Sequence, residues 1–446
     1  MSSQLSFILK ALIVGFLMLL LMIPLSMIRG TISERQQYRH QAIESVERSY
    51  AGKLKFAGPV LIVPFWDVET IITKNEKGIE SRHTETSTSF WISYPRTLDI
   101  NGSMTPNIKE LGIHKVRIYE WNAKMKAQFE FTAPDTGNPL IKRTLGAPYL
   151  SFIMNDTRGL MGAPNLIIAG EKKTIKQGAG SHGLAAQSKG VHVVLPEFPL
   201  EQMQKIPVEM DFLLGGTETL SFVPMADSNK ATIQSSWPHP NFSGDFSPRN
   251  SKISDKGFQA NWNISSLSAS AQTQYRNMNG LDQLDSFEVN LIDPVNIYSQ
   301  ADRASKYAFL FILLTFVGFL MFEIIKQLAI HPIQYGLVGL SLAIFFCLLL
   351  SLSEHMDFLK AYLIASVSCI GLLGIYVKSV LKSTVRSLGF SSMLTVLYSV
   401  LYGLLVSEDN ALVMGSILLF SILSAIMLVT RNVDWYQLGK KQTDAA

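Results

Sequence analysis

The sequence predicts an α+β membrane protein with one N-terminal transmembrane anchor, a β-rich, sandwich-like middle domain and a C-terminal bundle of five transmembrane helices. Three observations predict this architecture. Six stretches are apolar over about the 17–25 residues that a helix needs to cross a bilayer. The segment between the first two stretches is polar and alternates with the period of a β-strand. Its charges balance, with 28 basic and 28 acidic residues in 30–304, so the formal net charge of +4 comes from the rest of the chain.

The apolar stretches define the predicted domains. Because backbone polar groups in lipid must be satisfied internally, each stretch is predicted to be a helix. The first is long for a signal peptide and lacks a small-x-small cleavage site, which favours an uncleaved anchor over a cleaved signal. We therefore expect an anchor in residues 1–29, a β-rich domain in 30–304 and a helical bundle with its tail in 305–446. The six stretches are residues 11–28, 307–325, 333–352, 361–377, 388–406 and 412–429.

Basic residues in the short connections predict the orientation, because cytoplasmic loops are enriched in Lys and Arg. Seven basic residues fall on one side of the bundle and only Lys360 falls on the other. Arg29, Arg35 and Arg39 point the opposite way, but long domains translocate largely regardless of charge. We therefore expect both termini in the cytoplasm and residues 30–304 outside it. The seven are Lys326, Lys378, Lys382, Arg386, Arg431, Lys440 and Lys441.

The middle domain begins with a helical pattern and then changes to strands. Apolar residues at three- and four-residue spacing in 33–50 predict a helical stalk that continues the anchor. In residues 119–131 aromatic and apolar side chains alternate strictly with polar ones, which is typical of a strand with one buried face. Shorter cases occur at 258–264 and 287–291. We expect a mostly antiparallel sandwich held by its own hydrophobic core.

Motifs for catalysis, cofactors and metals are absent from the sequence. The histidines lack paired metal-ligand spacing, and no phosphate-binding loop or hydrolase motif is present. Both cysteines, Cys347 and Cys369, lie in apolar stretches, so no disulfide framework is expected in the middle domain. Zinc-finger spacings and basic helices with interleaved aromatic residues are also missing, which argues against nucleic-acid binding. The sequence predicts no catalytic, cofactor-binding or metal-binding residues, and a protein that is not an enzyme.

A dense aromatic segment in residues 236–246 is the candidate contact for a partner. Its prolines stiffen the chain and Gly244 permits a turn, while three aromatic residues supply contact area. The alternative is a turn that packs on its own sandwich, which buried aromatic residues make common. The candidate contact residues are Trp237, His239, Phe242 and Phe246.

A second candidate, at the membrane interface, is the polar pair Glu354 and His355. Ionisable groups close to lipid are often functional, so the pair is a candidate proton site. The alternative is a hydrated interfacial loop, because Asp357 and Lys360 lie close by in the sequence. At the other end of the bundle, Glu323 and Lys326 are one helical turn apart, and pairing or snorkelling explains both.

Several long segments carry a family resemblance. They are residues 23–29 (IPLSMIR), 236–246 (SWPHPNFSGDF), 302–307 (DRASKY), 331–335 (HPIQY) and 430–436 (TRNVDWY). With them the chain resembles, over nearly its full length, the CreD family of inner-membrane proteins, described as cell-envelope integrity proteins of Gram-negative bacteria. The resemblance implies an inner-membrane location with a periplasmic middle domain and a role in the envelope. It implies no catalytic residue.

Two functions remain open at this level. The first is a non-catalytic binding or scaffolding role in which the periplasmic domain contacts an envelope protein or cell-wall component, with the lipid bilayer as the other partner. The alternative is a transporter or transport accessory built on the six helices, which predicts that substituting Glu354 or His355 alters solute movement. An enzyme that acts on envelope material is the third and least supported hypothesis, because no motif accompanies it.

Overall fold

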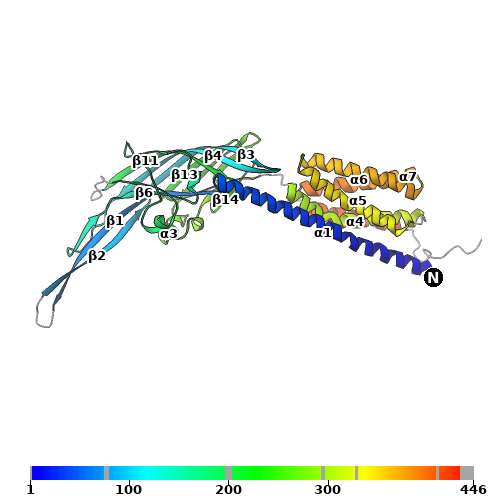
Figure 1. The fold of residues 1–446 in the computed structure, drawn as a ribbon, viewed down its shortest axis with the longest axis horizontal. Helices are drawn as coiled ribbons and strands as arrows, with labels where there is room; N and C mark the ends of the chain where they lie inside the picture. Colours follow the sequence, from blue (N-terminus) through cyan, green and yellow to red (C-terminus); the bar gives the residue numbers. More distant parts are fainter. Residues whose placement is uncertain are drawn as a thin grey trace, which may run out of the picture. The chain divides into compact units, whose positions relative to one another are not determined.

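The computed structural model describes residues 3–74, 80–195, 203–292, 297–326, 330–407 and 411–431. The chain forms two compact units. The helical unit is made of Met1–Arg39 and Val295–Ala446, and the β unit is made of His40–Pro294. The yellow-green to orange helices of Figure 1 and the larger part of the blue helix belong to the first unit, whereas the blue, cyan and green strands belong to the second.

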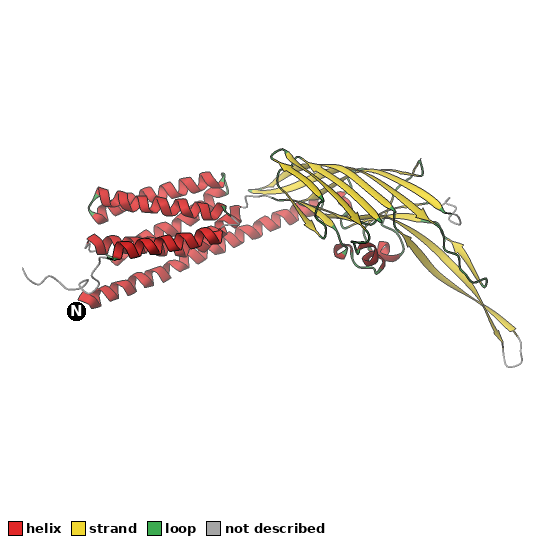
Figure 2. Cartoon of the chain, turned by 180° about the vertical axis from the view of Figure 1, so that it is seen from behind, coloured by secondary structure: helices red, strands yellow, loops and turns green. Residues whose placement is uncertain are grey.

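The helical unit contains the predicted anchor and C-terminal bundle. Among the described residues, five helices are long and apolar enough to cross a membrane, and a shorter apolar helix, Val413–Ser424, lies within α8. Helix α1 includes both the predicted anchor and the predicted stalk, so both are confirmed as helix. The long helices of this unit, red in Figure 2, are α1 (Ser3–Ser49), α4 (Ile297–Lys326), α5 (Pro332–Ser353), α6 (Phe358–Leu381), α7 (Thr384–Val406) and α8 (Ala411–Thr430).

Small side chains let the C-terminal helices approach one another. Helix α6 packs between α5 and α7, and its Ala361, Ala365 and Cys369 repeat every four residues and are all buried. Tyr362 on the same helix donates a hydrogen bond of 2.6 Å to the carbonyl oxygen of Tyr398 on α7. Close packing and interhelical hydrogen bonds are what hold helices together in lipid, where burial of apolar surface contributes little.

The β unit contains two sheets. Sheet A has nine strands: β1 (Leu54–Lys74), β2 (Glu80–Ser93), β5 (Ile141–Leu145), β6 (Tyr149–Met154), β9 (Lys176–Gln177), β10 (Gly190–Val194), β12 (Thr219–Val223), β14 (Pro240–Gly244) and β17 (Phe287–Leu291). Sheet B has eight: β3 (Thr97–Leu111), β4 (His114–Phe131), β7 (Asn165–Ile168), β8 (Glu171–Lys172), β11 (Gln204–Thr217), β13 (Ser228–Ser235), β15 (Asn250–Ser254) and β16 (Gly257–Ser265). Short helical turns are η1 (Thr157–Gly159), α2 (Gly183–Gln187), α3 (Ala271–Arg276) and η2 (Leu281–Gln283).

The two sheets share one hydrophobic core. Strand β4 contributes the alternating residues that the sequence predicted, with Tyr119, Trp121 and Phe129 buried and the intervening polar side chains mostly exposed. Phe56 of sheet A stacks on Phe212 of sheet B, with ring centroids 5.8 Å apart. The described strand pairs are antiparallel except for β1 with β12 and β3 with β13. The predicted, mostly antiparallel sandwich is therefore confirmed.

Strands β1 and β2 form a long antiparallel hairpin. An arginine side chain stabilises the base of this hairpin. An isolated two-stranded hairpin is at best marginally stable in water, so contacts at the base matter. Arg143 on β5 donates hydrogen bonds of 2.7 and 2.6 Å to the two carboxylate oxygens of Asp67 on β1. Its guanidinium carbon lies 4.4 Å from the ring centroid of Phe65 and 4.9 Å from that of Trp91. The hydrogen bonds from Arg143 lower the pKa of Asp67.

This ion pair predicts a pH-dependent contribution to stability. Because the pKa of Asp67 is lower in the folded protein, the contribution is present above the ordinary aspartate pKa of about 3.9 and is lost as the pH falls through the folded value. We expect Asp67→Asn to lower the thermal midpoint of the full-length protein at pH 7 by more than at pH 3. Thermal unfolding in detergent at both pH values measures this, with the exposed Asp99→Asn on β3 as the control. An equal loss at both pH values would contradict the prediction.

Candidate functional site

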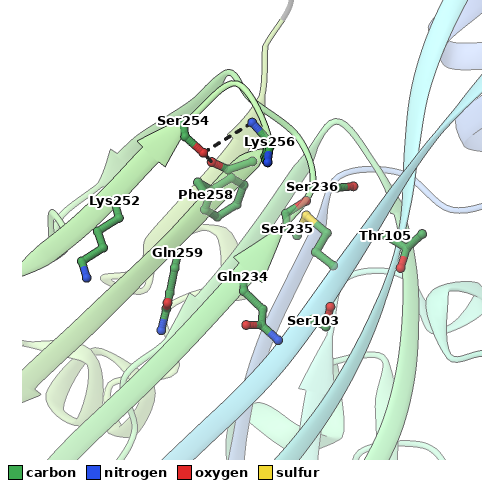
Figure 3. A pocket seen from close by; sticks show the side chains of 12 residues that line it. Ser103, Thr105, Gln234, Ser235, Ser236, Lys252, Ser254, Lys256, Phe258 and Gln259 are labelled. Atoms are coloured by element: carbon green, nitrogen blue, oxygen red, sulfur yellow. Dashed lines mark hydrogen bonds between the residues drawn. The ribbon is translucent and has the colours of Figure 1, made fainter.

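An open groove of about 570 Å³ lies on the outer face of sheet B (Figure 3). It crosses four strands that are hydrogen-bonded neighbours, β15, β16, β13 and β3. Its lining is rich in hydroxyl, amide and ammonium groups. The twelve lining residues are Ser103, Met104, Thr105, Gln234, Ser235, Ser236, Lys252, Ser254, Lys256, Gly257, Phe258 and Gln259.

The strand register places four of these polar residues in one row across the sheet. Lys252 on β15 is paired with Gln259 on β16, and Gln259 is paired with Gln234 on β13. Gln234 is in turn in register with Ser103 on β3. Figure 3 shows the four side chains next to one another on the same face. Since side chains alternate along a strand, these residues face outward while the residues beside them face the core.

A tight turn at one end of the groove supplies a second cation. Ser254 donates a hydrogen bond to the carbonyl oxygen of Gly257 and accepts one from the backbone nitrogen of Lys256. Gly257 has a φ of +126°, and a Cβ atom there would lie 2.0 Å from the carbonyl oxygen of Ser235. Only glycine fits this position. The turn thereby holds Lys256 on the same groove as Lys252, and none of the twelve lining residues is acidic.

The predicted aromatic segment packs largely on its own domain. The indole nitrogen of Trp237 donates to the carbonyl oxygens of His239 and Ile292, at 3.1 and 3.0 Å. Phe242 lies on β14, an edge strand of sheet A, and meets the ring of Trp262 edge-on. Trp237, Phe242 and Phe246 are all half-buried against the shared core. The arrangement is the packed turn that the sequence left as the alternative, and His239 is the exposed member of the four candidates.

The predicted interface pair is split between two environments. Glu354, at the end of α5, has a side chain that is 9% exposed and lies 3.5 Å from the Nε of Arg35 on α1. It also accepts a hydrogen bond of 3.3 Å from the hydroxyl of Tyr298 on α4. His355 is exposed. Glu354 thus joins three helices, which gives its burial a structural explanation; a proton-site role for the pair remains a prediction.

Further basic residues of α1 are bound within the helical unit in the same way. Lys10 forms an ion pair with Glu323 on α4, and Glu323 accepts a second hydrogen bond, of 2.8 Å, from the hydroxyl of Tyr335 on α5. Arg29 donates to the backbone oxygen of Ser305 on α4 at 2.9 Å. The sequence left pairing with Lys326 or snorkelling open for Glu323, and the side chain of Lys326 lies outside the described residues. The partner in the structure comes from the anchor helix.

A buried lysine in sheet A has a structural explanation as well. The Nζ of Lys55 donates to the carbonyl oxygens of Leu284 and Asp282, at 2.7 and 3.2 Å. Burial lowers its pKa. Lys55 is paired with Ser221 on the neighbouring strand, and Ser221 is paired with Glu288 on the next. The hydroxyl of Ser221 donates a hydrogen bond of 3.0 Å to the carboxylate of Glu288. Because the ammonium group is satisfied by backbone carbonyls, this row stabilises the sheet and leaves no free reactive group.

The groove was not predicted from the sequence. The segments that form it are residues 103–105, 234–236 and 252–259, and apart from Ser236 none of them belongs to a segment that was singled out as a candidate site. A signal does exist: in residues 97–105 buried positions alternate with polar ones, and the same holds for 231–234. That pattern locates strands with a polar outer face. It does not reveal which strands lie next to one another.

Comparisons with known proteins match one family over nearly the whole chain. The model of a family described as "Inner membrane protein CreD" matches residues 6–436. An Escherichia coli (strain K12) protein described as "Inner membrane protein CreD" is 36% identical over 431 residues, which covers 96% of this chain and 93% of the relative. A solved structure of a candidate nutrient-binding protein from Legionella pneumophila is 8% identical with a TM-score of 0.25, and covers 46% of this chain and 70% of that one. The family match and the extent of the sequence identity together show that this chain belongs to the CreD family of inner membrane proteins.

Proposed function

We propose that the chain contributes to cell-envelope integrity as a non-catalytic binding protein whose β unit lies in the periplasm and contacts an envelope component. The open, cationic groove on sheet B carries this proposal. Most of the described apolar side chains of the sandwich are packed into its cores, whereas the groove presents hydroxyl, amide and ammonium groups without acidic ones. Polar groups that converge on one open face can fix the orientation of a bound ligand through hydrogen bonds and charge.

Ion pairs within the helical unit also support the proposal. Both glutamates singled out in the sequence, Glu323 and Glu354, are ion-paired with basic residues of α1. Each carboxylate is therefore already engaged in a contact between helices, which gives both residues a structural role. This favours an anchoring role for the helices over the alternative of transport.

Site-specific photocrosslinking in intact cells tests the binding role. A photoreactive residue in place of Gln259, in the middle of the groove, is expected to give a discrete crosslinked product with a protein or with cell-wall material. A second probe at His239 tests the aromatic segment, whose only exposed candidate it is. The matched control replaces Lys230, an exposed residue on the same outer face of β13 that does not line the groove.

The outcomes separate the hypotheses. Crosslinks at Gln259 that are absent at Lys230 would support binding in the groove, and crosslinks at His239 alone would move the contact to the aromatic segment. Folded, correctly inserted protein that gives no product at Gln259 or at His239 would refute a binding role for the β unit.

A further inference from the structure

We propose that the groove on sheet B recognises an anionic oligosaccharide, with its charge carried by carboxylate or phosphate groups. The proposal names the ligand class for the binding role proposed above and therefore rests on that role. Its basis is the combination of two lysines, a row of side-chain amides and several hydroxyls on one open face, with no acidic residue in the lining.

The neutral groups suit a ligand that is itself covered with hydroxyls. A sugar hydroxyl both donates and accepts hydrogen bonds, so a complementary surface must offer both. Gln234 and Gln259 each present a donor and an acceptor, and Ser103 and Thr105 do so through their hydroxyls. All four are exposed and point to the same side of the sheet. Strand pairing holds their backbone positions at fixed spacing, so only the side-chain rotamers have to be ordered when a ligand binds.

The row of polar residues continues beyond the groove, and its extent indicates how long the bound ligand is. Ser103 is in register with Asn122 on β4, so the row runs from Lys252 across five strands. With strands about 4.8 Å apart, such a row extends over roughly 19 Å. A parallel row lies two residues further along the strands, where Thr232 donates to Asn261 at 2.9 Å. A surface of this extent fits a chain of several sugars better than a single small anion.

The positive charge of the groove indicates that the ligand is negatively charged. Lys252 and Lys256 both line the groove, and Asp255, in the same turn, does not line it. Lysine acts as a compact point charge and does not distinguish a carboxylate from a phosphate by geometry. The lining therefore specifies an anion without specifying its source.

Two other classes of partner fit the surface less well. An extended peptide would add to the free edge of β15, but that strand is five residues long with Lys252 at its centre, and short edges that carry lysine resist pairing. A membrane surface would take up apolar side chains. The apolar side chains in the lining, Met104 and Phe258, are 1% and 4% exposed and belong to the core.

Binding to purified full-length protein in nanodiscs of zwitterionic lipid tests the proposal. The probes are fluorescent oligogalacturonate, which carries carboxylates, and phosphorylated dextran, with methyl-esterified oligogalacturonate and plain dextran as neutral counterparts. We expect at least one anionic probe to bind about tenfold more tightly than its neutral counterpart. The tighter of the two anionic probes assigns the charge to carboxylate or phosphate.

Variants then locate the site. Lys252→Gln with Lys256→Gln should weaken binding of the anionic probe about tenfold, and Gln234→Leu with Gln259→Leu should weaken it severalfold. Lys230→Gln, which removes an exposed lysine outside the groove, should leave binding within twofold. All five residues are on the surface, so thermal unfolding is expected to match the unsubstituted protein.

Four results would overturn the inference: no binding of either anionic probe, equal binding of neutral and anionic forms, equal loss in Lys230→Gln and the double lysine variant, or full competition by vesicles of anionic lipid. Crosslinks at Gln259 in cells combined with any of these would leave the proposed binding role intact and reject only the glycan. Specific glycan binding without a crosslink in cells would sustain the ligand class and count against the proposed function.

Discussion

Replacement of Trp121 by alanine is expected to destabilise the β unit by about 3–5 kcal/mol, the usual loss when a large aromatic side chain is removed from a core. Trp121 is 1% exposed and lies on β4, between β3 and β11 in sheet B. Its ring meets Phe212 edge-on, with centroids 5.6 Å apart. Urea dependence of hydrogen exchange in β3, β4 and β11, measured by mass spectrometry on the full-length protein, reports this loss. A cost below about 1 kcal/mol would contradict the assigned packing.

A neighbouring glycine makes the packing test specific. A Cβ atom at Gly102 on β3 would lie 2.3 Å from the indole nitrogen of Trp121 and 2.9 Å from the Cβ of Ala123. Gly102→Ala should therefore cost about 1–3 kcal/mol through overpacking. The indole nitrogen of Trp121 is buried and has no hydrogen-bond partner among the described residues, so Trp121→Phe sacrifices no hydrogen bond.

The double variant Gly102→Ala with Trp121→Phe is thus expected to lose less stability than the sum of the two single changes, by at least about 0.5 kcal/mol. Strict additivity would show that the two side chains do not compete for the same space.

Glu323→Leu is expected to destabilise the helical unit by about 3 kcal/mol, because it leaves Lys10 of α1 without its ion-pair partner. The value lies at the low end for breaking a buried pair, since the two side chains retain 22% and 14% exposure. The hydroxyl of Tyr335 also loses its acceptor. Thermal unfolding in detergent, with α1 followed by a site-specific label, measures the effect.

A second substitution distinguishes the lost pair from a general loss of packing. Adding Lys10→Met to Glu323→Leu removes the uncompensated charge and should recover more than half of the lost stability. Lys360→Met serves as the control, because the pair of Lys360 with Asp357 is largely exposed and contributes little. A double variant as unstable as Glu323→Leu alone would show that the ion pair does not hold α1 to α4.

Local patterns in the sequence were sufficient for the architecture. Membrane helices are visible as apolar runs because lipid demands about 20 apolar residues in succession. The strand β4 is visible because one buried face forces every second residue from Tyr119 to Phe131 to be apolar. Both patterns are local, so they can be recognised without knowing which segments are neighbours in the fold. Both elements appear where they were predicted.

The groove and the ion pairs needed the tertiary structure, because they depend on which distant segments become neighbours. Lys10 and Glu323 are separated by 313 positions, so no local pattern in the sequence links them. Ser103 and Gln234 share a row only through the parallel pairing of β3 with β13. A polar side chain on an outer face carries no local mark of its neighbours in adjacent strands. Register, which is set by burial of the opposite face, decides that.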